Sequence, residues 1–233
     1  MRIIATINTL ILLVALSGGC SKSRDESVNT DLTANSMAPT TGELTETLSG
    51  IRHEATPTGN KCTIAGTSTV HDWTMDSKII SGFIEADEKF PESALSDATA
   101  AKPKVSVSMP VRSFKSGKST MDEKMQTSMD STKFMKIEYR LIELKPKSKP
   151  GATGALEFDA VGALTIIGNT VTNTMPVTIE KKGTNIVVIG SAPIKMTDYK
   201  MKPPVITLLG IPTMSVGDDL KITFEWQLAK KVK

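Results

Sequence analysis

The sequence has few aromatic residues, cysteines and histidines, and these shortages exclude several classes of protein. Aromatic residues make up 4% of its 233 residues, with two cysteines and two histidines. No cluster has the spacing of metal ligands, and no nucleophile elbow or phosphate-binding loop occurs. The formal net charge of +3 is too small to indicate nucleic-acid binding. We therefore expect no metal, no other cofactor and no nucleic-acid partner.

One adjacent pair of polar residues, His71 and Asp72, invites a catalytic interpretation. Neighbouring residues in a strand point to opposite faces, so the two side chains would not form a base and its orienting partner. We expect His71 to be a hydrogen-bonded residue at a strand end, and we expect no enzyme activity.

The N-terminus has the pattern of a secretory signal. Arg2 precedes an apolar stretch at 3–16, which is too short to span a bilayer and is followed by small residues at 17–19. The next residue, Cys20, stands where the lipobox of bacterial lipoproteins has its lipid-bearing cysteine. The alternative is an ordinary signal peptide with an incidental cysteine. The sequence thus predicts a signal peptide at 1–19 and lipidation of Cys20.

A lipidated Cys20 would anchor the protein to a membrane of the cell envelope. Several acyl chains on one residue anchor stably, whereas a single chain binds only marginally. Ser21 is not the aspartate that commonly retains lipoproteins at the inner membrane, so we expect the outer membrane. Acylation would also leave Cys62 unpaired, and its apolar surroundings predict a small buried hydrophobe.

Residues 20–60 are predicted to form the lipid anchor and a flexible tether. Residues 21–60 are rich in Ser, Thr, Asn, Gly and Pro and contain no aromatic residue. Such a segment cannot bury enough surface to offset its ordering entropy. About forty residues of this kind reach roughly 35 Å as a random coil. The rest of the chain, 61–233, fits a single domain.

The domain is predicted to consist of β-strands. Alternation of apolar and polar residues is clearest at 220–228, where Leu220, Ile222, Phe224, Trp226 and Leu228 share one face. Short connections favour antiparallel pairing. The predicted strands are 63–71, 79–87, 105–114, 136–144, 156–166, 171–179, 185–196 and 220–228.

One segment, 120–133, has a helical period. Met121, Met125 and Met129 recur every fourth residue, and acidic residues occupy the first turn. A methionine stripe can indicate copper. No His or Cys lies nearby in the sequence to complete such a site, so we expect a helix face packed on a sheet.

Eight antiparallel strands avoid free edges by closing into a barrel. We therefore predict an all-β fold, an eight-stranded antiparallel, lipocalin-like barrel with one short helix. Small residues such as Ser68, Gly66, Ala160 and Gly162 fall on the predicted inner faces and favour a cavity over a filled core. A collapsed, filled core is the alternative.

Several motifs resemble those of the YceI-like family of exported bacterial proteins in their sequence and in their order along the chain. The best marked is 161–170, which follows a "G-x-L-T-I-x-G-x-T" pattern through Gly162, Leu164 and Thr170. The resemblance covers about 61–229 and implies a lipocalin-like barrel with a lengthwise cavity for a polyisoprenoid or similar lipid. The other matching segments are 66–73, 107–117, 121–125, 195–199 and 217–219.

The predicted function is a membrane-anchored protein that holds a long apolar ligand in its barrel. A ligand-free envelope or stress protein with a filled barrel, acting through its outer surface, is the alternative. Lys195 and Tyr199 are predicted to meet a polar head group at the mouth. The apolar stretch 203–212 is either a lid over the cavity or an ordinary packed loop. The predicted lining residues are Phe158, Ala160, Gly162, Leu164, Ile166, Met175, Val177, Ile222, Phe224 and Trp226.

Overall fold

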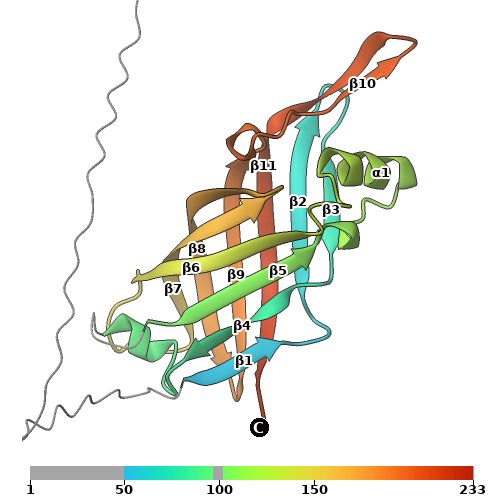
Figure 1. The fold of residues 1–233 in the computed structure, drawn as a ribbon. Coiled ribbons are helices and arrows are strands. Elements are labelled where there is room, and N and C mark those ends of the chain that lie inside the picture. The colour runs from blue at the N-terminus through green and yellow to red at the C-terminus, as the bar shows by residue number, and fades with distance from the viewer. Residues whose placement is uncertain (1–49, 97–101, 233) are drawn as a thin grey trace, which may run out of the picture. The chain divides into compact units, whose positions relative to one another are not determined.

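The computed structural model describes residues 50–96 and 102–232. Strands dominate this part of the chain, and one α-helix lies outside the sheet at one end of it (Figure 1). The elements are β1 (Ile51–Ala55), β2 (Lys61–Ser68), β3 (Trp73–Ser77), β4 (Ser81–Ala86), η1 (Glu92–Leu95), β5 (Lys104–Pro110), η2 (Val111–Ser113), α1 (Ser119–Ser128), β6 (Lys136–Pro146), β7 (Ala155–Ile166), β8 (Asn169–Lys182), β9 (Asn185–Lys195), η3 (Thr197–Tyr199), β10 (Val205–Leu208) and β11 (Ile211–Lys230).

The sheet closes on itself. Strands β4 to β9 follow in sequence order, β11 adds to β9, and β1 pairs with both β4 and β11. This gives a closed ring of eight antiparallel strands, as predicted. At the α1 end, β2 takes over from β1 along β11, and β3 pairs with β2. The outer edge of β3 forms one isolated bridge, between Asp76 and Lys115.

Each of the eight predicted strands corresponds to an observed one, and three further strands were missed. The missed strands are β1, β3 and β10, which have five, five and four residues. Strands this short carry too few alternating positions for the pattern to be recognised. The stretch 203–212, predicted as a lid or a packed loop, instead forms β10, a tight turn and the start of β11.

The predicted tether extends too far toward the C-terminus. Residues 51–55 form β1, whose inward-facing residue is His53, only 7% exposed. Its neighbours Arg52 and Glu54 face outward and form an ion pair with a 3.0 Å N–O distance. A strand with a histidine on its inner face and charged residues on its outer face has the composition of a linker. This explains why β1 was included in the predicted tether. The signal peptide, Cys20 and the remainder of the tether lie outside the described residues.

The predicted helix exists but is shorter than expected. It begins at Ser119 and ends at Ser128, and Asp130 has a positive φ of 44° that ends the helical path. Within the described part of the chain, no helix has the length and apolar character needed to span a membrane.

Aromatic rings cover glycines on the inner face of the barrel. A side chain at Gly162 would collide with the ring of Tyr139, and one at Gly66 with Trp73. Gly190 lies under Phe224 in the same way. The expectation that Gly162 and Gly66 widen the lumen is therefore wrong, because rings from neighbouring strands fill the space that these glycines leave.

Candidate functional site

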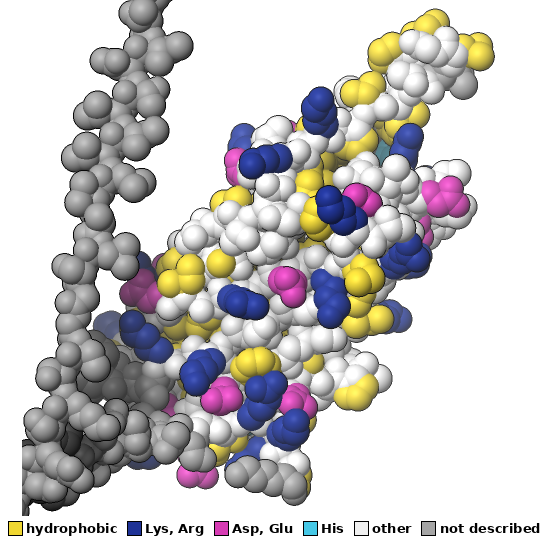
Figure 2. Space-filling view, viewed as in Figure 1, with side chains coloured by type: hydrophobic (Ala, Val, Ile, Leu, Met, Phe, Trp, Pro, Cys, Tyr) yellow, Lys and Arg dark blue, Asp and Glu magenta, His cyan; other side chains and the backbone are white. Residues whose placement is uncertain are grey.

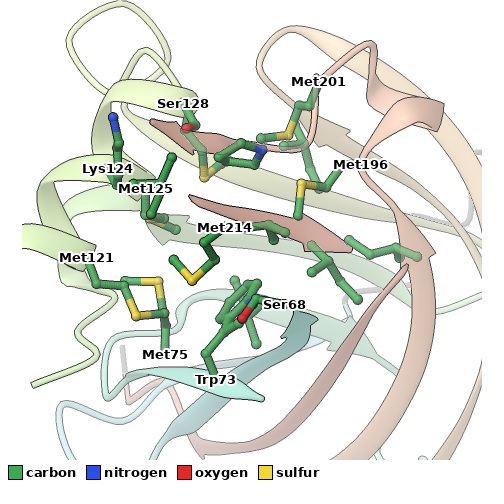
Figure 3. Close-up of a pocket in the computed structure, with 18 of the residues that line it drawn as sticks. Ser68, Trp73, Met75, Met121, Lys124, Met125, Ser128, Met196, Met201 and Met214 are labelled. Atoms are coloured by element: carbon green, nitrogen blue, oxygen red, sulfur yellow. The ribbon is translucent and has the colours of Figure 1, made fainter. Parts of the chain in front are cut away.

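A chamber of about 450 Å³ occupies the α1 end of the barrel. Its wall combines strand residues such as Ile64 and Ile222 with α1 and with the β10–β11 hairpin (Figure 3). Exposed residues, among them Thr120 and Lys124, also line it, so the chamber reaches the surface. Its volume lies in the range of about 300–1,000 Å³ that is usual for small-molecule sites. We call it the upper chamber.

Methionines dominate the wall of the upper chamber. Seven of the twelve in the chain line it. Figure 3 shows Met214 projecting between the α1 methionines and the opposite wall. Methionine is flexible and polarisable, so such a wall can adapt to apolar ligands of different shape. The seven methionines are Met75 on β3, Met121, Met125 and Met129 on or next to α1, Met196 and Met201 beside η3, and Met214 on β11.

The charged groups of this wall are basic. Lys118 and Lys124 line the upper chamber, and no Asp or Glu of the described residues does. His71 also lines it, and its Nδ1 lies 2.9 Å from the carbonyl oxygen of Asp72. No histidine lies near the α1 methionines in the sequence, but the fold brings His71 to the same chamber wall. The expectation that no histidine lies close to them is therefore wrong. No three His, Cys, Asp or Glu side chains in 50–96 and 102–232 are grouped as metal ligands.

Tyr199 anchors one side of the upper chamber. Its side chain is 1% exposed, and its hydroxyl oxygen accepts a hydrogen bond of 2.7 Å from the Asn173 amide. The Asn169 amide donates to the Tyr199 carbonyl at 3.0 Å. Burial raises the pKa of the Tyr199 hydroxyl, the Asn173 hydrogen bond opposes that shift, and Asp198 adds to it. The residue therefore stays neutral and fixed.

A second, smaller space of about 90 Å³ lies deeper in the barrel, and we call it the lower chamber. Ile194 and Ile222 belong to the walls of both chambers. Tyr139 and Trp226 line the lower chamber, and no described residue forms a hydrogen bond with their buried Oη and Nε1 atoms. Burial raises the pKa of Tyr139 to about 12. The lower chamber thus offers two unused hydrogen-bond donors in an apolar setting.

The structure distributes the predicted lining residues between the two chambers. Ile166 lies in the upper chamber and Ile222 in both. Phe158 is fully buried but lines neither, and Gly162 is covered by the Tyr139 ring. The lower chamber takes the rest, Ala160, Leu164, Met175, Val177, Phe224 and Trp226.

Of the two predicted mouth residues, one lies at the site. Tyr199 lines the upper chamber, although as a buried wall residue. Lys195 does not line it, because its ammonium group faces outward and pairs with Asp219 at 3.4 Å. The predicted lipid-bearing Cys20 lies outside the described residues. Cys62 is 1% exposed, which confirms the prediction of a small buried hydrophobe, and burial raises its pKa to about 12.

Much of the upper chamber was missed from the sequence. The methionine stripe at Met121, Met125 and Met129 was visible, but its role as a cavity wall was not. Met75, Met196 and Met214 are scattered along the chain and share no local pattern. Only the fold brings them together.

The comparisons with known proteins agree with this architecture. A family model described as YceI-like domain matches residues 56–228. BcnA from Burkholderia cenocepacia has a similar structure, with a TM-score of 0.56 and 20% identity over 72% of this chain and 95% of that one. A polyisoprenoid binding domain from Saccharophagus degradans, implicated in plant cell wall breakdown, gives a TM-score of 0.55 and 12% identity over 78% and 99%. At these identities the likeness shows the fold alone. No curated protein matches the chain.

Proposed function

The chain belongs to the YceI-like domain family, and from that premise we propose that it is a membrane-anchored carrier that holds a long apolar lipid, such as a polyisoprenoid, in its barrel. The observation that supports this most is the methionine-rich upper chamber, which reaches the surface and is apolar apart from its two rim lysines, His71 and a few hydroxyl groups. The predicted lipid on Cys20 would hold the barrel near an envelope membrane, where such ligands reside.

The two chambers suggest how a long ligand would lie. A chain entering past α1 would fill the upper chamber first and then press against Ile194 and Ile222, which belong to both walls. Moving these side chains would open the lower chamber to the end of the ligand. Each methylene group buried contributes about 0.8 kcal/mol before the costs of association are subtracted. The length of the ligand would therefore set its affinity.

Native mass spectrometry of the purified full chain, before and after organic extraction, tests this function. We expect a bound apolar lipid that extraction removes and that added long-chain polyprenol replaces. Met125→Gln and Met214→Gln, which place an amide in the chamber wall, should each weaken polyprenol binding roughly tenfold. Met135→Gln is the matched control, because Met135 is 63% exposed and lines neither chamber. A protein that is always empty and takes up no polyprenol would refute the proposal.

A second function, an interaction protein with a filled barrel, has one observation in its favour. The lower chamber holds only about 90 Å³, so that half of the barrel is nearly closed by side chains. Under this function the Met125→Gln variant would behave like the unmodified chain in every lipid-binding assay. The mass spectrometry experiment therefore separates the two functions.

A further inference from the structure

The hairpin formed by β10 and the start of β11 ends in an apolar tip. It projects beyond the barrel (Figure 1), and Figure 2 shows hydrophobic side chains gathered at its end. Leu208 pairs with Ile211, so the turn consists of Leu209 and Gly210 alone. Leu209 is 94% exposed and Ile211 66%. No residue from 203 to 216 is charged.

The backbone of the turn makes Leu209 an unexpected residue. Leu209 and Gly210 have φ values of 52° and 82°, the positive pair of a type I′ turn, for which Asn-Gly is preferred. The β7–β8 turn has the same geometry at Ile167 and Gly168, with φ values of 44° and 75°. Ile167, however, packs against the hydrophobic core. No packing against the described residues accounts for a strained, exposed leucine, which points to an apolar partner outside the barrel.

The apolar tip is continuous with the upper chamber. Pro204, Ile206 and Met214 belong to the hairpin and line that chamber. Val70, 65% exposed, lies in the turn after β2, where the amide of the preceding Thr69 donates a 3.0 Å hydrogen bond to the Ser215 carbonyl at the hairpin base. Apolar surface therefore extends from the tip to the opening of the chamber.

Basic residues flank this surface. Lys200 and Lys202 lie just before the hairpin, and neither they nor the two lysines of the chamber wall form an ion pair with any described residue. The acidic residues that follow the hairpin are engaged locally. Asp218 accepts hydrogen bonds from Thr197, and Asp219 pairs with a lysine. Exposed apolar residues bordered by lysines that pair with no described residue fit a bilayer that contains anionic phospholipid.

We propose that the hairpin 203–216 is a membrane-contact element that inserts Leu209 and Ile211 into an anionic bilayer and turns the upper chamber toward the lipid. The contact needs no ligand in the barrel. It adds to the proposed carrier function a direct path between the bilayer and the chamber.

A position-specific fluorescence experiment tests this contact. The full chain carries Cys20→Ser, and because Cys62 is buried, an introduced cysteine is the single accessible thiol. An environment-sensitive dye is attached at Leu209→Cys or, as the control, at Thr184→Cys in the exposed β8–β9 turn. The probes are vesicles of phosphatidylglycerol and phosphatidylcholine in equal parts, with doxyl-labelled lipid as quencher. We expect a blue shift and quenching for position 209 and no change for position 184.

Removing the lysines should weaken this contact without changing the fold. In the labelled Leu209→Cys chain, Lys200→Gln and Lys202→Gln should lower vesicle partitioning about fivefold per lysine. Identical emission of the position-209 dye with and without vesicles would overturn the inference. A blue shift without vesicles that grows with protein concentration would overturn it too, because a second copy would then cover the tip. A chain that binds polyprenol without tip insertion refutes this inference alone, and tip insertion without bound lipid refutes the carrier function alone.

Discussion

At the scale of single residues, the barrel interior holds two tyrosines with opposite hydrogen-bonding states. The Tyr199 hydroxyl has a partner in Asn173, and the buried Tyr139 hydroxyl has none in the part of the chain that the structure describes. An unpaired buried hydroxyl loses its hydration without compensation, whereas a paired one contributes to stability. Burial of the Tyr139 hydroxyl therefore destabilises the protein without ligand, and a ligand with an acceptor oxygen would remove this destabilisation.

This contrast predicts different effects of the same substitution. In delipidated protein, Tyr139→Phe should leave the free energy of unfolding unchanged or raise it by up to about 1 kcal/mol, because it removes an unpaired group. Tyr199→Phe should lower it by about 1 kcal/mol, because it breaks the bond to Asn173. Urea unfolding followed by circular dichroism measures both. A clear loss of stability in Tyr139→Phe would mean that its hydroxyl has a partner.

His53 gives the barrel a predictable dependence on pH. Burial, and then Lys181 and Lys230, lower its pKa from the ordinary 6.5. Below pH 6.5 the unfolded chain binds a proton that the folded chain binds less readily, so the free energy of unfolding should fall as the pH decreases from 7 to 5. Thermal unfolding across this range measures the slope. The His53→Leu variant has no titratable group at this position, so the free energy of unfolding should depend less on pH. An equally steep pH dependence in that variant would assign the effect to other groups.

At the scale of elements, each covered glycine ties one strand to a ring on the next. Gly162 on β7 lies against Tyr139 on β6, and no side chain fits between them. The pattern differs from a simple small-residue lining, because the glycine and the ring together fill the space of two ordinary residues. This packing fixes the register of the two strands.

A side chain at Gly162 should therefore disturb the barrel. Gly162→Val should lower the free energy of unfolding by about 1–3 kcal/mol through overpacking against the Tyr139 ring. Ala163→Val is the matched control, since Ala163 is the next residue along β7 and faces the other side, where valine suits a strand. Chemical denaturation of both variants gives the comparison, and equal stabilities would show that the ring moves aside freely.

At the scale of the whole molecule, the upper chamber explains why so many methionines lie at one end of the barrel. Oxidation to the sulfoxide would make this wall polar, and a bound lipid would shield it. Under mild hydrogen peroxide, Met121, Met125 and Met214 should oxidise several-fold more slowly in polyprenol-loaded protein than in extracted protein. Peptide mass spectrometry measures the rates. Exposed Met135 should oxidise equally in both forms, and protection of Met135 as well would indicate a general effect of the lipid.

The strands and the upper chamber differed in how far the sequence could predict them. The alternation of Ile222, Phe224 and Trp226 with polar residues identified β11 and its inner face, and the family match confirms the resemblance. β1 could not be recognised, because an inward His53 between two charged residues has no apolar alternation. The upper chamber depends on a helix, a hairpin and two turns meeting in space, and residue order does not encode such a meeting locally.

Pairing between β1, the first strand that the structure describes, and β11, the last, closes the barrel and affects how the chain folds. His53 pairs with Lys230, so almost the entire described sequence lies between the two sides of this seam. Contacts of such separation form late, because the entropy of the intervening chain must be overcome first. Until residues 228–230 are available, the edge of β1 that faces β11 has no partner, and free edges invite pairing between molecules. A chain ending before residue 228 is therefore expected in the pellet of a sedimentation assay, with the intact chain remaining in the supernatant.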